Sequence, residues 1–360
     1  AMLPMQFQQA FQPPQPGDMF VGRIVYPAAS FGPEPAGLGW CFDFRGARRW
    51  SASPEADATD RSAIDELIAF WENRVTELKT RHAYPADVAE VLPTDCWTEE
   101  SGVAFPLYRM AGTVLDYAKL LREGWNVASE GDDDFSRSCR TALEAFRKTI
   151  RRYAEMSGVD HDVRRVLVDL LERGPVSFRE AVQFFWLWAL HAGTWNYGRL
   201  DVALGPFLAR DLDAGVLSEE SATGLLCSLW RLMHAYANQY NNRVIIGGRG
   251  RPDEASADRF ALLAIEATRR VRLNQPQLSL RFYEGQSPAL WDAAISAIGE
   301  GCTFPMLYND DVNIPAVAAA FGVSDELAAD YTPFGCGEYV LGHRSVGTPS
   351  GVINLPKALE

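Results

Sequence analysis

The amino-acid sequence predicts an α/β fold in which a helical N-terminal layer leads into an α/β barrel or half-barrel. Three observations support this prediction. Of the 360 residues, 47% are hydrophobic, so a chain of this length can bury a large core. Most of residues 60–173 carry apolar positions at helical spacing. After Gly174, short apolar runs alternate with helical segments, a pattern typical of parallel strands joined by crossover helices.

The N-terminal half is expected to be helical with little strand. Residues 1–17 are polar and proline-rich without periodicity, which predicts an arm on the surface. A short β-type run, DMFVGRIVYP, follows over residues 18–27. Residues 60–82 carry Ile64, Trp71 and Leu78 on one face and predict an amphipathic helix. Further helices are expected over residues 106–128, 135–156 and 160–173.

The C-terminal half begins with a capping box, Ser177 to Glu180, which opens an almost wholly apolar helix. Such a helix belongs inside a large core. The elements expected after it are helices over 202–213 and 219–238, a strand over 244–247, a helix over 255–271, a strand over 277–283, a helix over 288–299, a strand over 304–308 and a helix over 311–321. No repeat or linker divides the chain, so we expect a helical part over 18–173 and an α/β part over 174–360 within one domain.

Charge and composition exclude several classes of partner. The chain holds 34 Lys and Arg against 47 Asp and Glu, a net charge of −13, which argues against a nucleic-acid backbone or an anionic membrane. No apolar stretch reaches the roughly 18 residues that cross a bilayer. The N-terminus has Gln and Pro where a signal peptide needs an apolar run. Six dispersed cysteines fit a reduced compartment, so the sequence predicts a cytoplasmic protein.

Familiar cofactor signals are absent from the sequence. It contains no GxxxxGK[ST] phosphate loop and no HExxH zinc helix. The glycine-rich segment at residues 247–252 follows a predicted strand but does not open directly into a helix, so we interpret it as a plain turn. The five histidines are far apart, and the acidic run at residues 132–134 lacks the spacing of a calcium loop. The sequence therefore predicts no metal site.

The candidate catalytic residues lie in one segment, YTPFGCGEY, over residues 331–339. Cys336 and Glu338 lie two residues apart, and side chains at i and i+2 of an extended segment project to the same side. The flanking glycines allow a tight backbone turn. Sulfur and carboxylate could then face one substrate, the first as a reactive centre and the second as an acid or base. Taken alone, the segment is better explained by a buried structural cysteine beside an exposed glutamate.

Four segments in chain order carry a family resemblance: NYGRLD at 196–201, RVRLNQPQLSLR at 270–281, PMLYND at 305–310 and GCGE at 335–338. Two upstream segments add to it: DMFVG at 18–22 and GTVLDY at 112–117. Together they resemble the motifs of the glycyl radical enzymes, the superfamily of pyruvate formate-lyase and its diol-dehydratase and choline-lyase relatives. The resemblance assigns residues 18–360 to a pyruvate formate-lyase-like domain.

The resemblance implies a ten-stranded α/β barrel with the cysteine loop at its centre. In the family, a separate S-adenosylmethionine-dependent iron–sulfur activase installs a glycyl radical, which takes a hydrogen atom from the cysteine. The resulting thiyl, here on Cys336, abstracts hydrogen from a small-molecule substrate, with Glu338 as the base. The barrel would keep water away from the radical. Further candidates for the substrate pocket are Asp116, Asn196 and His343, for each of which a turn or helix-end hydrogen bond is an alternative. A buried Arg199–Asp201 pair is also expected.

Departures from the family pattern narrow the function. Pyruvate formate-lyase carries two adjacent cysteines, whereas Cys336 stands between Gly335 and Gly337. The loop therefore resembles that of the eliminating and decarboxylating members. Gly112 stands where several diol dehydratases have a histidine. These features suggest a lyase that cleaves a C–O, C–N or C–C bond of a small hydroxylated or carboxylated molecule, and they leave the substrate open.

A final departure is the missing radical glycine. No Arg-Val-x-Gly-Tyr-like segment occurs in the 360 residues. We expect that the chain is a piece of a longer polypeptide and is inactive by itself. A split enzyme with a separate glycyl subunit is an alternative, as is a catalytically silent barrel that binds a metabolite or a partner. The sequence leaves the oligomeric state open, and a homodimer remains compatible with it.

Overall fold

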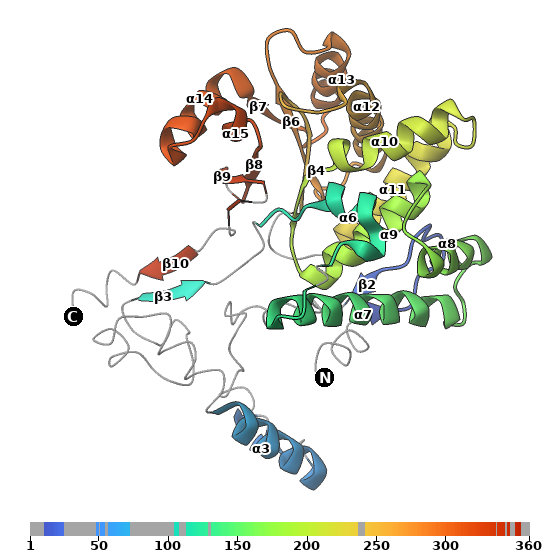
Figure 1. Ribbon diagram of the computed structural model, residues 1–360, viewed down its shortest axis with the longest axis vertical. Coiled ribbons are helices and arrows are strands. Elements are labelled where there is room, and N and C mark those ends of the chain that lie inside the picture. The colour runs from blue at the N-terminus through green and yellow to red at the C-terminus, as the bar shows by residue number, and fades with distance from the viewer. Residues whose placement is uncertain are drawn as a thin grey trace. The chain divides into compact units, whose positions relative to one another are not determined.

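The computed structural model divides the chain into two compact units. They are residues 1–29 with 111–347, and residues 30–110 with 348–360. The structure describes residues 11–24, 48–49, 51–54, 57–72, 104–107, 113–128, 131–236, 242–335, 337–342, 344–345 and 350–353. Most of their elements are labelled in Figure 1. Within these ranges, the structure contains no helix that has both the length and the apolar character needed to span a membrane.

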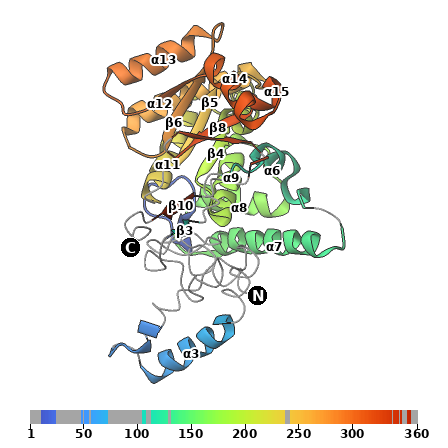
Figure 2. The ribbon, with the colours of Figure 1, turned by 90° about the vertical axis from the view of Figure 1, so that its left-hand side faces the viewer.

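The larger unit is built on a four-stranded parallel sheet whose order in space, β4-β5-β6-β7, equals the order in sequence. Val244 on β5 lies opposite Leu278 on β6, and Leu280 lies opposite Leu307 on β7. The strands are β4 (Asn196–Arg199), β5 (Arg243–Gly247), β6 (Gln277–Phe282) and β7 (Met306–Asn309). Figure 2 shows β4, β5 and β6 beside the helices that connect them. The structure thus confirms the parallel α/β arrangement expected from the alternating pattern.

Helices connect successive strands of this sheet and continue beyond it. They are α10 (Leu200–Asp213), α11 (Glu219–Ala235), α12 (Glu254–Val271), α13 (Pro288–Gly299), α14 (Asp310–Phe321) and α15 (Asp325–Ala328). Every residue of β5 is buried, as the apolar run over residues 244–247 predicts, whereas β7 at the edge of the sheet is only partly buried. Each predicted helix boundary in this half lies within three residues of the observed one.

The N-terminal layer of this unit packs around one buried helix. Its elements are β1 (Phe11–Gln12), β2 (Arg23–Ile24), α6 (Tyr117–Glu123), the 3-10 turn η2 (Gly124–Asn126), α7 (Asp134–Glu155), α8 (His161–Glu172) and α9 (Phe178–Ala192). The predicted capping box forms: the side chains of Ser177 and Glu180 each accept from the other residue's backbone N–H. Helix α9 buries Phe184, Phe185 and Trp186 completely, so it lies inside the core as expected.

Two expectations for this layer differ from the structure. Phe11 lies within the predicted surface arm, yet it is buried against Tyr153 and His191. The prediction of one helix over 106–128 is wrong, because α6 begins only after Asp116, whose side chain caps it, and ends at Gly124, whose φ is +55°. Helical spacing alone did not reveal either end of this short helix.

The second unit contains α3 (Ala58–Glu72) and an antiparallel pair formed by β3 (Ala104–Leu107) and β10 (Ser350–Ile353). Helix α3 matches the start of the helix predicted over 60–82, and the rest of that prediction lies outside the described residues. The strand partners are about 250 residues apart in sequence, with Ala104 opposite Ile353. Local patterns could not indicate this pairing, because neither strand carries a turn signal that points to the other.

Candidate active site

The segment that carries the predicted catalytic pair forms a β-hairpin. Its strands, β8 (Tyr331–Phe334) and β9 (Glu338–Leu341), are antiparallel, with Phe334 opposite Glu338. Three residues connect them, and the backbone N–H of Gly337 donates to the carbonyl oxygen of Phe334 over 3.0 Å. Gly335 and Gly337 have φ values of +55° and +121°, a region that other residues rarely adopt. The flanking glycines are therefore required by the turn itself.

Glu338 lies against the loop at the tip of this hairpin. Its side chain is exposed, and a Cβ placed on Gly335 would lie 2.6 Å from Glu338 Oε2. Glycine at position 335 therefore also makes room for the carboxylate. Cys336 and His343, two of the predicted site residues, lie outside the described residues. The expectation that Cys336 and Glu338 face one substrate accordingly stays a prediction.

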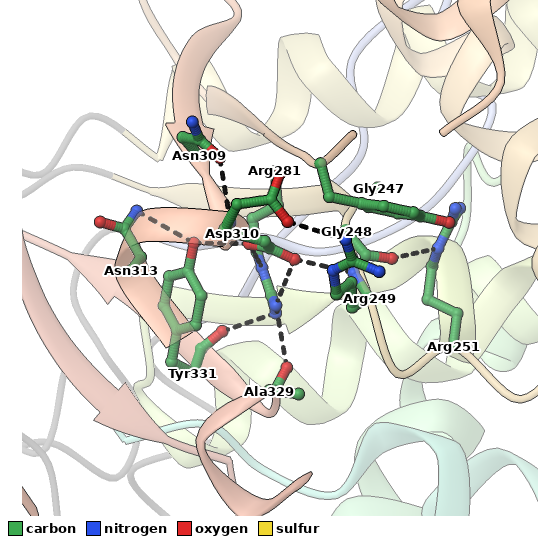
Figure 3. Close-up of polar contacts among 12 residues, drawn as sticks. Gly247, Gly248, Arg249, Arg251, Arg281, Asn309, Asp310, Asn313, Ala329 and Tyr331 are labelled. Atoms are coloured by element: carbon green, nitrogen blue, oxygen red, sulfur yellow. Dashed lines mark hydrogen bonds and ion pairs between the residues drawn. The ribbon is translucent and has the colours of Figure 1, made fainter. Parts of the chain in front are cut away.

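The base of the hairpin rests on a buried ion pair (Figure 3). Arg281 at the end of β6 donates from Nε and Nη2 to the two carboxylate oxygens of Asp310, over 2.9 and 2.8 Å. The hydroxyl of Tyr331, the first residue of β8, donates to Asp310 Oδ1 over 2.7 Å. Arg281 Nη1 also donates to the Tyr331 carbonyl oxygen over 2.9 Å. Two residues that end resemblance motifs thus hold the start of the cysteine hairpin.

The same carboxylate holds the turn after β5. The backbone N–H of Arg249 donates to Asp310 Oδ2 over 2.7 Å, and Arg251 Nε donates to the Gly248 carbonyl oxygen over 2.9 Å (Figure 3). The glycine-rich segment is therefore a turn, as predicted. Asp201 lies 3.6 Å from Arg251, within ion-pair distance. Arg199 makes no direct ion pair with Asp201, but the two charges interact: burial raises the pKa of Asp201, and the charge of Arg199 opposes this effect.

Asn196 at the start of β4 braces the hairpin from another strand. Its side chain is completely buried, and Nδ2 lies 3.3 Å from the hydroxyl oxygen of Thr332 on β8. Its Oδ1 accepts from the backbone N–H of Gly198 over 3.1 Å. The described contacts of this side chain are therefore with the protein's own loop and hairpin. Thr332 is a residue that the sequence alone did not single out.

Asp116 is exposed and caps helix α6, where its Oδ1 accepts from the backbone N–H of Lys119 over 2.8 Å. This contact is the helix-end role that was one of its two interpretations. The next residue, Tyr117, is buried, and its hydroxyl lies 3.0 Å from Thr194 Oγ1. Burial raises the pKa of Tyr117 above its usual range.

A cavity of about 170 Å³ lies where these segments meet. Its lining includes Val114, Tyr117, Tyr197, Arg199, Thr332 and Gly342. The cavity is therefore lined by residues next to Asp116, by the strand that begins at Asn196 and by the hairpin that contains Glu338. The side chains of Asp116, Asn196 and Glu338 themselves do not line it. Arg199 donates from Nη2 to the Gly247 carbonyl oxygen over 2.9 Å, and burial lowers its pKa to about 10. The described residues contain no group of three or more potential metal ligands.

Comparison with known proteins places this architecture in a family. A sequence model described as pyruvate formate lyase-like matches residues 18–360. An isethionate sulfite-lyase from Nitratidesulfovibrio vulgaris is 30% identical over 363 residues, which cover 83% of this chain and 43% of that protein. The chain belongs to the pyruvate formate lyase-like family. It spans less than half the length of the curated relatives it matches.

Solved structures share the fold. A glycyl radical enzyme from Archaeoglobus fulgidus superposes with a TM-score of 0.66 at 21% identity, covering 95% of this chain and 51% of that one. The glycerol-bound B12-independent glycerol dehydratase from Clostridium butyricum gives 0.68 at 19% identity, covering 94% and 49%. Sequence and fold together place the chain in the glycyl radical enzyme superfamily that its motifs resemble.

Proposed function

We propose that this chain carries the cysteine half of a glycyl radical lyase, with Cys336 as the thiyl-forming residue and Glu338 as the base. The observation that carries the proposal is the position of the Glu338 carboxylate, which packs on Gly335, the residue covalently bonded to Cys336. The side chain of Glu338 is exposed and forms no ion pair with the described residues, so no described cation competes with a substrate for its carboxylate.

The substrate class follows from the relatives. Their names include isethionate sulfite-lyase, (2S)-3-sulfopropanediol dehydratase and trans-4-hydroxy-L-proline dehydratase. All act on small molecules that carry a hydroxyl group. We infer a small hydroxylated substrate with a carboxylate, a sulfonate or a second hydroxyl, from which the enzyme eliminates water or sulfite; trans-4-hydroxy-L-proline has one alcohol hydroxyl, so in that case the hydroxyl itself is the leaving group. Sulfonates widen the class that the sequence alone suggested.

Each residue then has a definite role. A glycyl radical, when supplied, provides the acceptor for the hydrogen atom of the Cys336 thiol. Where a sulfonate or a second hydroxyl is the leaving group, the Cys336 sulfur takes a hydrogen atom from the neighbouring hydroxyl-bearing carbon, so a C–H bond breaks and an S–H bond forms. Glu338 removes the hydroxyl proton, and the adjacent carbon releases its leaving group with the bonding electrons. The product radical regains a hydrogen atom from Cys336. The braced hairpin would hold both groups in place through these steps.

The test uses the complete gene product with a matched radical S-adenosylmethionine activase under anaerobic conditions. Isethionate, glycerol, sulfopropanediol and trans-4-hydroxy-L-proline are supplied in turn, and products are measured by mass spectrometry. We expect turnover of at least one hydroxylated substrate, and none with Cys336→Ala. The proposal fails if no substrate of this class reacts although the glycyl radical forms, a result that would favour a catalytically silent barrel.

A further inference from the structure

Arg243, the first residue of β5, is a buried cation with only neutral partners among the described residues. Only 1% of the surface of Arg243 is exposed to solvent. Nη1 donates to the Tyr308 hydroxyl on β7 over 2.7 Å, and Nη2 donates to Gln277 Oε1 on β6 over 2.7 Å. Nη2 also donates to the carbonyl oxygen of Gly335 over 2.9 Å. One side chain thus joins three parallel strands to the tip of the hairpin.

The Gly335 carbonyl that Arg243 contacts lies directly before Cys336 in the chain. That oxygen belongs to the peptide group whose nitrogen is the backbone nitrogen of Cys336. Because a peptide group is planar, a hydrogen bond from Arg243 to its oxygen restrains the plane of the peptide group that follows Gly335. Glycine is the residue with the greatest backbone freedom, so a hydrogen bond to the Gly335 carbonyl restrains the loop more than it would at another residue type.

Burying a guanidinium beside neutral acceptors is costly, and a leucine or methionine would fill the same space without that cost. Hydrogen bonds from a charged donor are shorter than neutral ones and roughly twice as strong. The flat guanidinium, oriented by Tyr308 and Gln277, can therefore hold one carbonyl oxygen firmly. A cation here is explained by the need to hold the loop rather than by packing.

We propose that Arg243 is the positioning residue of the cysteine loop: through Gly335, it sets the backbone orientation at Cys336. This proposal depends on the proposed function in one respect only, namely that Cys336 is the residue that reacts. The contact with Gly335 and its effect on the loop do not depend on any activity. Tyr308 and Gln277 act indirectly, because they orient the guanidinium of Arg243.

The first test is hydrogen–deuterium exchange of the 360-residue chain. Arg243→Met removes every donor at similar length, and Arg249→Met is the matched control, because that arginine pairs with Asp311 and does not touch the hairpin. We expect exchange in the peptide spanning 334–339 to rise at least about tenfold with Arg243→Met, with β6 and α12 unchanged. Arg249→Met should leave the hairpin unchanged. An equal rise throughout the sheet, or no rise at the hairpin, would overturn the proposal.

Two further variants keep the test decisive if Arg243→Met does not fold. Tyr308→Phe removes only the hydroxyl that orients Nη1, and Arg243→Lys retains a cation. We expect Tyr308→Phe to raise exchange at the hairpin less than Arg243→Met does, and Arg243→Lys to restore part of the protection. Exchange at the hairpin that is unaffected by both variants would contradict the positioning role.

The second test uses the activated complete enzyme. A misplaced cysteine loop should lower kcat of Arg243→Met by roughly 10²-fold, with KM within about twofold and the glycyl radical signal unchanged. A rise in KM with unchanged kcat would instead mean that Arg243 binds substrate, and it would refute the proposal. If the wild-type enzyme shows no turnover, the proposed function fails, while the exchange experiment still decides whether Arg243 holds the loop.

Discussion

Arg281 and Asp310 form a two-point ion pair in which both side chains are completely excluded from solvent. The pair joins β6 to the start of α14. Asp310 additionally accepts hydrogen bonds from the Tyr331 hydroxyl and the Arg249 backbone. A buried pair of this kind adds little net stability compared with apolar residues, but removing one partner leaves the other as an uncompensated buried charge. Its role is therefore to define where the cysteine hairpin begins.

Removing this carboxylate should destabilise the protein strongly. We expect Asp310→Asn to lower the free energy of unfolding by about 3–5 kcal/mol, because the Arg281 guanidinium is left buried without a counter-charge. The neighbouring substitution Asp311→Asn is the control, since its ion pair with Arg249 is largely exposed and should contribute less than about 1 kcal/mol. Denaturant unfolding of both variants measures the difference. Similar losses in the two would show that the buried pair has no special role.

A single methyl group at the end of β5 should be poorly tolerated. Gly247 has a φ of +73°, and a Cβ there would collide with the carbonyl oxygen of Arg281. Gly215 has a φ of +65° with open space around it. Gly215→Ala should therefore lower the free energy of unfolding by about 1–2 kcal/mol, because only the left-handed backbone is unfavourable for alanine there. Gly247→Ala should lower it by more, because the clash is added. Thermal unfolding of both variants tests this, and equal melting temperatures would contradict the predicted clash.

Stability should fall at acid pH because of His191. This side chain is buried between Phe11 and Phe146, and burial lowers its pKa from 6.5 to about 3. Between those two values the unfolded chain binds a proton that the folded chain does not, so stability decreases as pH falls, by up to about 1.4 kcal/mol per pH unit.

Denaturant unfolding of the wild type and of His191→Phe between pH 7 and 4 measures this contribution. The slope of the unfolding free energy against pH should be shallower in His191→Phe. His161→Gln is the control, since His161 is highly exposed, and it should keep the wild-type slope. An identical slope in His191→Phe would assign the acid sensitivity to other groups.

Glu338 should matter for turnover but not for folding. In the complete activated enzyme, Glu338→Gln keeps the shape of the side chain and removes the base, so kcat should fall by about 10²–10⁴. Glu326→Gln, an exposed substitution in the first turn of α15, should leave kcat unchanged. Product formation is followed together with the glycyl radical signal by electron paramagnetic resonance. Near-normal turnover by Glu338→Gln would make Glu338 a structural residue.

The 360 residues alone should not acquire a glycyl radical. They contain no Arg-Val-x-Gly-Tyr-like segment, so incubation with a matched activase and S-adenosylmethionine should give no glycyl doublet by electron paramagnetic resonance. The complete gene product, treated identically, serves as the positive control. A glycyl doublet from the 360-residue chain would refute this prediction.

The sequence by itself determined the order of the helices from α9 to α14 and of the parallel strands β5, β6 and β7, because each of these elements carries its own signal. It did not predict strand β4, helix α15 or the hairpin strands β8 and β9. The capping box at Ser177 and the apolar run of α9 are local features, and they predicted a buried helix that the structure contains. The turn at Gly335 and Gly337 was likewise evident from the glycines. The family resemblance was also readable from segments in chain order.

Only the tertiary structure decided which of these segments touch. Arg281 and Asp310 each end a recognisable motif, but their pairing, and the contact of both with Tyr331, depends on the register of β6 against β7. Arg243 carries no local signal, since nothing near it in sequence shows that its guanidinium reaches Gly335, 92 positions away. Hydrogen bonds of this kind depend on distances between strands that the fold sets, and no local periodicity encodes those distances.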